Sequence, residues 1–304
     1  MSGTTLTSPA EPRDPADAWV DCTCGGRHWG LRGAAGLLLT RPVPDAAGLP
    51  DAAPHLEVLL QLRGERSHHG GTWGLPGGAR KTGEQPLATA LREAHEEAGL
   101  DPALVTPRWW RVVSHGPWTY TTVVAEAPPD LVLGEPNWES AQLEWVANPD
   151  DGRTLHPGFA AAWPALAPLL GARLELIVDN ANVVGSRPDG WWKDRRQAAA
   201  RLRDQLEDLA TIGLPQALID PDGPDLSGWW PDVTLVVEGQ ARGLPPGQHV
   251  TVVEALGDGD DEIARRAASG TVVVTADKYL KQRVKAKGAQ ILAPGRLLSL
   301  LQPA

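Results

Sequence analysis

The stretch between Gly78 and Leu100 carries the side chains best suited to chemistry. A loop that contains glycine is followed by Glu93, Glu96 and Glu97, which are spaced i, i+3, i+4. On a helix these positions lie close together, and like charges so spaced cost about 0.2 to 0.5 kcal/mol per pair. Mg²⁺ or Mn²⁺ would neutralise them, because these ions bind carboxylate oxygens together with water and substrate phosphates. The spacing therefore predicts a divalent-cation site for a diphosphate.

A helix over residues 84–98 is expected to position these glutamates. Its apolar residues fall on one face, opposite the glutamates: Leu87, Leu91, Ala94 and Ala98. Gly99 is expected to end the helix, because glycine adopts the left-handed conformation without strain. The loop before the helix lets backbone approach a phosphate closely, so we expect substrate contacts from Gly77, Gly78 and Arg80.

Taken together, this spacing resembles the Nudix box at every defining position. The match is Gly78, five residues, Glu84, seven residues, Arg92-Glu93-Ala94, one residue, Glu96-Glu97, one residue and Gly99-Leu100. The preceding Trp73-Gly-Leu-Pro-Gly-Gly78 resembles the family's lead-in strand and turn. The resemblance covers about residues 18–170 and implies an α/β/α sandwich with a mixed sheet. It also implies divalent cations and hydrolysis of a nucleoside diphosphate linked to another moiety.

The resemblance also implies roles for individual residues. The metal ligands and catalytic residues of the box would be Glu93, Glu96 and Glu97. Arg92 would act in catalysis by orienting Glu93, since a guanidinium binds a carboxylate in a fork geometry, and Glu84 would contribute to an outer or substrate-bound cation. The family takes its general base from the box or from a later loop. Glu139 is the second candidate, and the alternative is that it is a solvated loop acid. In the implied reaction a metal-bridged water attacks phosphorus.

Length and composition are those of a soluble two-domain protein. The chain has 304 residues, enough for two domains, and a net charge of -10, which argues against a surface devoted to nucleic acid. Cys22 and Cys24 are too close for a relaxed disulfide, so a reducing cytoplasm is expected. No apolar run reaches the roughly 18 residues of a membrane span. Residues 1–17 are poor in large apolar side chains and are expected to form a disordered tail.

The pattern of apolar residues predicts an α/β fold in two parts. In the first part we expect a further helix at 159–170 and strands at 34–39, 56–62, 109–113, 120–125 and 143–146. From residue 173 to about 302, strands alternate with helices, which predicts a second domain with a parallel sheet. Its strands are expected at 174–179, 233–237, 250–253 and 271–275, and its helices at 194–210, 260–268 and 278–286.

Acidic residues of the second part lie where a parallel sheet would gather them. Asp179 ends a strand and Asp277 follows another, and the carboxyl ends of parallel strands form the ligand-binding edge of such sheets. Asp179-Asn-Ala-Asn182, Gly259-Asp-Asp261 and Thr275-Ala-Asp277 resemble the motifs of PIN-like nucleases, in particular the NYN branch. The implied Mg²⁺ or Mn²⁺ ligands are Asp179, Asp194, Asp260, Asp261 and Asp277. The catalytic residues among them would be Asp179, Asp260 and Asp277. In the implied reaction a metal-activated water cleaves an RNA phosphodiester.

Several other features admit two interpretations. A basic stripe would contact phosphates or form a solvated helix face: Lys193, Arg195, Arg196, Arg201 and Arg203. Trp191 and Trp192 would stack on bases or pack in the core. Cys22, Cys24 and His28 have the composition of a metal site, but a structural zinc site needs four ligands and the chain has no second cysteine pair. We therefore do not predict zinc from the sequence.

The sequence favours a Nudix pyrophosphohydrolase joined to a metal-dependent, ribonuclease-like domain. Two alternatives stay open. One is a bifunctional enzyme that removes a 5′ cap or diphosphate from RNA and then degrades the body of the RNA. The other is a nucleotide-sensing Nudix domain that regulates the nuclease, although a sensor has no need of a complete set of box glutamates. The expected partners are a nucleoside diphosphate-linked small molecule and, at the second domain, RNA, with no membrane.

Overall fold

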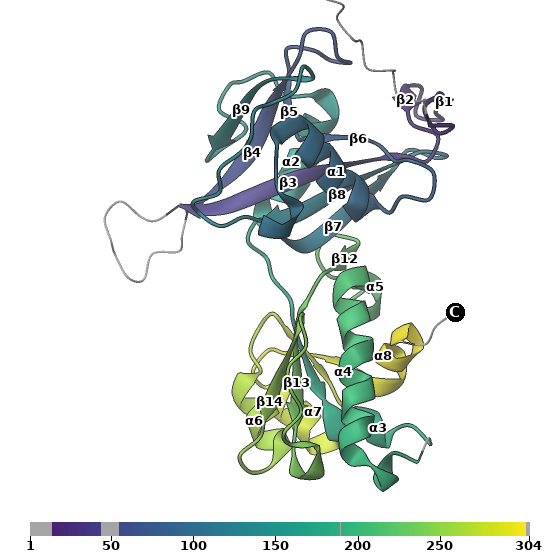
Figure 1. Cartoon of the computed structure of the whole chain (residues 1–304), viewed down its shortest axis with the longest axis vertical. Coiled ribbons are helices and arrows are strands. Elements are labelled where there is room, and N and C mark those ends of the chain that lie inside the picture. The colour runs from purple at the N-terminus through teal and green to yellow at the C-terminus, as the bar shows by residue number, and fades with distance from the viewer. Residues whose placement is uncertain (1–13, 44–54, 189, 302–304) are drawn as a thin grey trace, which may run out of the picture. The chain divides into compact units, whose positions relative to one another are not determined.

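The chain folds into two compact units. The computed structural model describes residues 14–43, 55–188 and 190–301. The first unit consists of Met1–Val105, Val112–Val123 and Ala127–Trp163, and the second of Thr106–Arg111, Val124–Glu126 and Pro164–Ala304. Among the described residues, no helix is both long and apolar enough to cross a membrane. Figure 1 labels many of the elements of both units.

The first unit is organised around β3 (Ala34–Val43), the central strand of a mixed sheet. The sheet also contains β4 (His55–Arg63), β5 (Trp73–Gly74), β6 (Gly77–Ala79), β7 (Thr106–Ser114), β8 (Thr119–Glu126) and β9 (Ser140–Val146). β6 pairs with the start of β3 and β4 with its end. The first seven residues of β3 are all buried, which explains why they form an uninterrupted apolar run instead of alternating.

The box helix, α1 (Pro86–Ala98), packs on β3 and β6. It begins two residues later than expected, because proline favours the first helical turn and leaves Gln85 extended. Gly99 ends it as predicted, with φ of 61°. The expected division into an apolar and an acidic face is wrong in one respect, since Glu97 lies on the buried face and is only 2% exposed.

The described N-terminal part of the first unit contains secondary structure that was not expected. A short hairpin of β1 (Trp19–Asp21) and β2 (Arg27–Trp29) was not predicted, because three-residue strands show no useful periodicity. Residues 1–13 of the expected disordered tail lie outside the described residues. Asp14 is described, however, and accepts hydrogen bonds from the Ala16 amide and the Thr82 hydroxyl at 2.8 and 3.0 Å. The first unit also contains η1 (Pro102–Leu104) and the start of α2 (Pro157–Leu166).

The second unit is built on a parallel sheet of five strands in the order β14-β13-β10-β15-β16. Their bounds are β10 (Glu175–Asp179), β13 (Asp232–Val237), β14 (Val250–Glu254), β15 (Thr271–Val274) and β16 (Gln290–Leu292). The α/β class and the parallel sheet expected from the sequence are thereby confirmed. The strand order reverses around β10, which is the kind of switch point where parallel sheets bind ligands.

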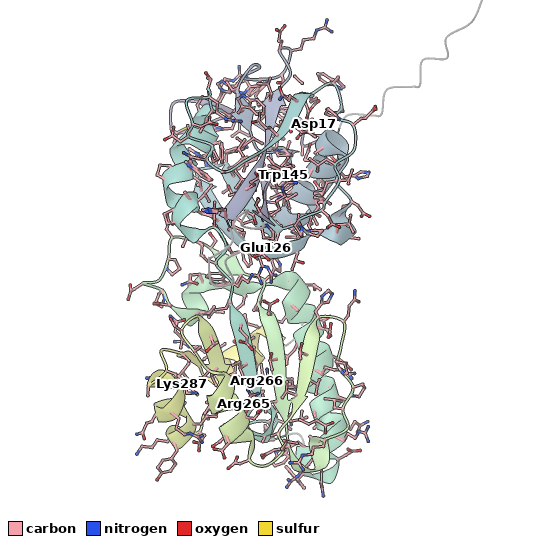
Figure 2. All side chains as sticks on the ribbon, turned by 90° about the vertical axis from the view of Figure 1, so that its left-hand side faces the viewer. Asp17, Glu126, Trp145, Arg265, Arg266 and Lys287 are labelled. Carbon is pink, nitrogen blue, oxygen red and sulfur yellow. The ribbon has the colours of Figure 1, made fainter. Side chains whose placement is uncertain are left out.

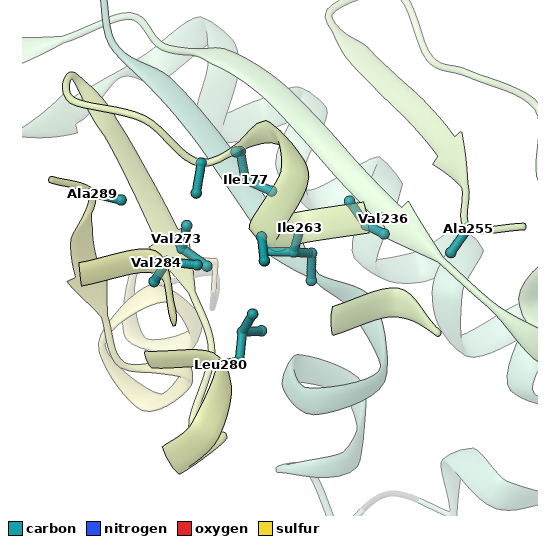
Figure 3. Close-up of a cluster of buried hydrophobic side chains, with 10 residues drawn as sticks. Ile177, Val236, Ala255, Ile263, Val273, Leu280, Val284 and Ala289 are labelled. Atoms are coloured by element: carbon teal, nitrogen blue, oxygen red, sulfur yellow. The ribbon is translucent and has the colours of Figure 1, made fainter. Parts of the chain in front are cut away.

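Helices in two groups pack against this sheet (Figure 1). One group is α3 (Asn180–Gly185), α4 (Arg195–Ile212) and α8 (Pro294–Leu301), and the other is α6 (Gly259–Arg266) and α7 (Lys278–Lys285). The core between the sheet and the second group is drawn in Figure 3, where Ile177, Val236 and Val273 meet Ile263 and Leu280. Alternate strand residues, such as the buried Leu176 and Val178, therefore face the first group.

The remaining elements of the second unit are short. They are η2 (Ala167–Leu169), η3 (Trp191–Lys193), β11 (Leu214–Pro215), α5 (Gln216–Ile219), β12 (Gly228–Trp229) and η4 (Gly239–Ala241). α6 is stabilised by its charges, since acids occupy its first turn while Arg265 and Arg266 of its last turn, which are labelled in Figure 2, both contact Glu262 at 2.7 Å.

Candidate active site

Arg92 is the centre of the acidic site in the first unit. Its Nε and Nη2 donate to the two carboxylate oxygens of Glu84 at 2.8 and 3.0 Å, which is a fork geometry. Its Nη1 donates to Glu93 Oε1 at 2.7 Å and to Glu96 Oε2 at 3.3 Å. Nη2 also donates to the Ala79 carbonyl at 3.1 Å. One guanidinium thus orients three of the four box glutamates.

Glu84 acts in this structure as the counter-charge of Arg92. Besides the fork, its Oε2 accepts hydrogen bonds from the Thr89 hydroxyl at 2.8 Å and the Lys81 amide at 3.0 Å. Burial works to raise the pKa of Glu84, but the bonds from Arg92, Lys81 and Thr89 outweigh it and bring the pKa to about 2. The carboxylate is therefore ionised at neutral pH, and it positions Arg92. Its expected contribution to an outer cation stays a prediction.

The three expected metal ligands of the box have different surroundings. Glu96 is the most open, with a side chain 47% exposed, whereas that of Glu93 is 12% exposed. Glu97 is buried and its Oε2 accepts a hydrogen bond from the Gly77 amide at 2.8 Å. Burial raises the pKa of Glu97 to about 8, against the Gly77 bond, and the Glu93 charge adds to the rise. Burial also raises the pKa of Glu93, despite the adjoining Arg92. Glu93 and Glu97, whose ionised forms are both disfavoured, lie side by side. Such pairs are typical of functional sites in which a bound cation balances the charge.

Gly78 explains why a glycine precedes this helix. It pairs with Ala35 of β3 and thereby places β6 beneath the box. A Cβ added to Gly78 would lie 2.5 Å from Glu93 Oε1, so a larger residue would collide with the carboxylate. The expected substrate residues of this loop are partly engaged, since the Gly77 amide bonds Glu97 and Arg80 donates to the Glu84 carbonyl at 2.8 Å. Their contact with substrate stays a prediction.

A small basic cavity opens beside the same loop. Its volume is about 210 Å³ and its lining includes Arg32, Arg80 and Lys81. Arg80 also donates to the Arg32 carbonyl at 3.2 Å, which holds the guanidinium at this surface. Cationic side chains next to the box are the kind that bind phosphate groups.

Glu139, the second candidate for the general base, lies close to Glu93 of the box. It is half-buried and immediately precedes β9, and its carbonyl accepts a hydrogen bond from the Gly64 amide at 2.8 Å. Its charge helps to raise the pKa of Glu93, which places the two carboxylates within electrostatic range. The structure therefore keeps Glu139 as a candidate.

The donor set of this site fits a hard divalent cation. Three carboxylates of graded exposure are held by fixed donors, and oxygen ligands are those that Mg²⁺ and Mn²⁺ prefer. Gln61 is fully buried, and neither polar atom of its amide has a hydrogen-bond partner among the described residues. The same amide is near enough to lower the pKa of Glu97. A polar group so placed is suited to bind a ligand of the metal site.

A second group of acids lines a cavity in the second unit. Its volume is about 250 Å³, and its polar lining comprises Asp179, Asn182, Glu238, Asp258, Asp260 and Asp277. Asp179 ends β10, Glu238 follows β13, and Asp277 follows β15, so the cavity lies at the carboxyl ends of neighbouring parallel strands. Three of the expected ligands, Asp179, Asp260 and Asp277, are thus brought together.

Hydrogen bonds from the chain fix these acids in place. Asp179 accepts from the Asn182 amide at 3.0 Å and from the Thr275 hydroxyl at 2.9 Å. Asp277 caps α7 by accepting from the Leu280 amide at 2.7 Å. Burial raises the pKa of Asp179. Burial also raises the pKa of Asp260, and the charges of Asp179 and other neighbouring acids add to this rise, which brings the pKa to about 6. Mutual repulsion of this kind is typical of carboxylates that share a cation.

Two expected ligands do not line the cavity. Asp194 is the N-cap of α4 and accepts from the Gln197 amide at 2.9 Å, and Asp261 accepts from Arg283 at 2.7 Å. Both acids thus have local partners that a sequence motif does not reveal. Sequence reasoning missed Glu238 and Asp258, which line the cavity instead. Glu238 could have been found by applying the strand-end rule to residue 238 as it was applied to Asp179.

The first unit is an α/β domain in which an acidic helix packs on a glycine-containing strand of a mixed sheet. The family model described as the NUDIX domain matches residues 43–160. Putative 8-oxo-dGTP diphosphatase 3 of Mycobacterium tuberculosis is 49% identical over 170 residues, covering 52% of this chain and 74% of that protein. The chain therefore belongs to the Nudix family.

Two further proteins are similar to part of this chain. A nucleoside triphosphate pyrophosphatase/Nudix hydrolase fusion protein of Bifidobacterium longum is 42% identical over 156 residues, covering 50% of this chain and 31% of that protein. Among solved structures, the Nudix hydrolase RenU of M. smegmatis is 44% identical, covers 51% of this chain and 95% of its own, and has a TM-score of 0.45.

Gly78→Ala should displace the Glu93 carboxylate, because the added Cβ would meet its oxygens. We expect metal-dependent turnover to fall by about tenfold to a hundredfold, the size of effect that a small misplacement of a reacting group produces. The melting temperature should change little, since a flexible carboxylate gives way. Initial rates with Mg²⁺ and thermal melts measure the two effects.

Gly295→Ala is the matched control for this substitution, because a Cβ added at that position meets nothing within 4 Å. It should keep wild-type turnover. If Gly78→Ala also kept wild-type turnover, Gly78 would not control the position of Glu93.

Proposed function

We propose that this chain is a divalent-cation-dependent Nudix pyrophosphohydrolase that cleaves the phosphoanhydride of a nucleoside diphosphate derivative. The observation that carries this proposal is that Arg92 fixes Glu93 and Glu96 beside the buried Glu97, together with membership of the family. A buried acid such as Glu97 loses its proton at a cost, and a bound cation would offset that cost. The proposed ions are Mg²⁺ and Mn²⁺.

In the proposed mechanism each side chain has a distinct task. Mg²⁺ or Mn²⁺, when bound, would neutralise substrate phosphate and lower the pKa of an attacking water. Glu93, Glu96 and Glu97 would hold the cation, and Arg92 would keep Glu93 and Glu96 in position through Nη1. The proton of the attacking water would pass to Glu97 or to Glu139.

The name of one relative provides a first substrate to test. The Mycobacterium tuberculosis relative is named for action on 8-oxo-dGTP, an oxidised nucleoside triphosphate. We propose 8-oxo-dGTP as the first candidate alongside nucleoside diphosphate sugars and dinucleotides, because all of them contain the same phosphoanhydride. The basic cavity formed by Arg32, Arg80 and Lys81 would bind phosphate groups beyond the cleaved bond.

A substrate screen with Mg²⁺ and with Mn²⁺ tests this proposal. We expect release of a nucleoside monophosphate, measured by chromatography, and loss of that activity in EDTA. Glu97→Gln should lower turnover by at least about a hundredfold, because it removes a metal ligand and candidate base. Glu135→Gln, which changes an exposed glutamate outside the box, should not. Wild-type turnover of Glu97→Gln on every accepted substrate would contradict the assignment.

A second candidate function is favoured by the acidic cavity of the second unit. We propose that Asp179, Asp260 and Asp277 hold one or two divalent cations and act on an RNA phosphodiester, as the resemblance to NYN and PIN-like nucleases implies. Support comes from the position of the cavity at the carboxyl ends of parallel strands and from the raised pKa values of Asp179 and Asp260. Glu238 and Asp258 join the proposed ligand set, and Asp194 and Asp261 leave it.

Substitution of one cavity acid tests whether the two sites are independent. Asp179→Asn or Asp277→Asn should abolish cleavage of a labelled single-stranded RNA while leaving nucleotide hydrolysis unchanged. Asp261→Asn is the matched control, since this acid lies on the same edge of the unit but pairs with Arg283 instead of lining the cavity. Loss of both activities in a folded variant would contradict the idea of two sites.

The same screen separates the two remaining alternatives. If RNA with a 5′ cap or diphosphate outcompetes free nucleotides, the units act in sequence on one RNA. If a nucleotide binds without metal, is not hydrolysed and changes RNA cleavage, the Nudix unit is a sensor.

A further inference from the structure

Three metal-ligating side chains that take no part in either acidic site lie together at the β1–β2 hairpin. They are Cys22, Cys24 and His28, and their sulfur and ring nitrogen atoms lie within 4.8 Å of one another. Cys24 Sγ is 3.2 Å from His28 Nε2. Both cysteines are free thiols.

The backbone of the hairpin holds these three side chains at one place. Val20 pairs with His28 across the two strands, and the Cys22 amide donates to the Gly26 carbonyl at 3.0 Å. Gly25 has a φ of 85°, which turns the chain back so that Cys24 faces the second strand. The ring of His28 stacks on Trp118 with centroids 4.2 Å apart and planes at 12°, so its orientation is also fixed.

A second histidine, which sequence spacing does not link to these three residues, lies close to His28 in the fold. His115 follows β7, and its ring centroid is 4.9 Å from that of His28. The Cys22 thiol donates to the His115 carbonyl. A Cβ on the next residue, Gly116, would collide with Thr23 Oγ1, which shows how closely this turn approaches the hairpin.

Two thiols and two imidazoles are a suitable donor set for Zn²⁺. A tetrahedral ion with Zn–S near 2.3 Å and Zn–N near 2.0 Å requires neighbouring ligand atoms to be about 3.3 to 3.8 Å apart. The ligand atoms of Cys22, Cys24 and His28 lie within 4.8 Å of one another, so rotation of these side chains can bring them to that spacing. Soft sulfur ligands also separate this site from the oxygen sites that suit Mg²⁺.

We propose that Cys22, Cys24, His28 and His115 form a structural Zn²⁺ site that fastens the β1–β2 hairpin to the turn between β7 and β8. Strands of three residues cannot hold a hairpin together in water, and a metal site can replace the missing core. The chain just after the hairpin contacts the loop before the box helix, because the Gly33 carbonyl accepts a hydrogen bond from the Arg80 amide at 3.0 Å. The site would thereby order the loop that carries Arg80.

Metal analysis of the full chain, purified under reducing conditions, tests this proposal. We expect one tightly bound zinc ion per chain. Replacement by Co²⁺ should give the thiolate-to-cobalt charge-transfer band and the visible bands of a tetrahedral ion, which oxygen-only sites do not give. Cys24→Ser should abolish these bands, and since Cys24 is exposed the variant should still fold. His115→Ala should weaken Zn²⁺ affinity by at least about tenfold.

His69→Ala is the matched control, because it removes a histidine from a separate cluster formed by His68, His69 and His156. It should keep the zinc and the cobalt spectrum. Absence of bound zinc in the wild-type chain, or full zinc binding with unchanged cobalt bands in Cys24→Ser, would overturn the proposal. Unchanged affinity in His115→Ala would overturn the assignment of the fourth ligand.

Discussion

The fork between Arg92 and Glu84 is the interaction on which the geometry of the Nudix site depends. A guanidinium that binds both oxygens of one ionised carboxylate cannot rotate, so its remaining donor is fixed toward Glu93 and Glu96. Glu84 is itself held by the Lys81 amide of the loop before the helix. One ion pair therefore joins the loop, the helix and the ligand positions.

Burial of acids is the common physical feature of the two acidic sites. Glu97 on the box helix and Asp179 at the end of β10 are both buried, and burial raises the pKa of each. Each acid keeps hydrogen-bond donors, the Gly77 amide for Glu97 and the Thr275 hydroxyl for Asp179. Buried carboxylates of this kind reduce stability when ionised without a counter-charge. Two different sheets thus build sites whose charge balance would be completed by cations.

Local patterns allowed much of the fold to be predicted, and long-range packing accounts for the rest. The box helix and its end at Gly99 follow from residues close together in sequence. The burial of Glu97 could not be predicted, because it depends on how closely Gly77 of β6 approaches the box helix. The pairing of Asp261 with Arg283 could not be predicted, because Arg283 lies on a later helix. His115 was not considered with Cys22 because only the fold brings the two together.

The central claim is that Glu93, Glu96 and Glu97 hold a divalent cation in the arrangement set by Arg92. Anomalous diffraction from crystals grown with Mn²⁺ tests this claim most directly. The account predicts an anomalous peak within about 2.0 to 2.6 Å of carboxylate oxygens of the box. It also predicts that the peak is lost or moved in Arg92→Ala. A Mn²⁺ peak confined to the cavity of the second unit, with none at the box, would contradict it.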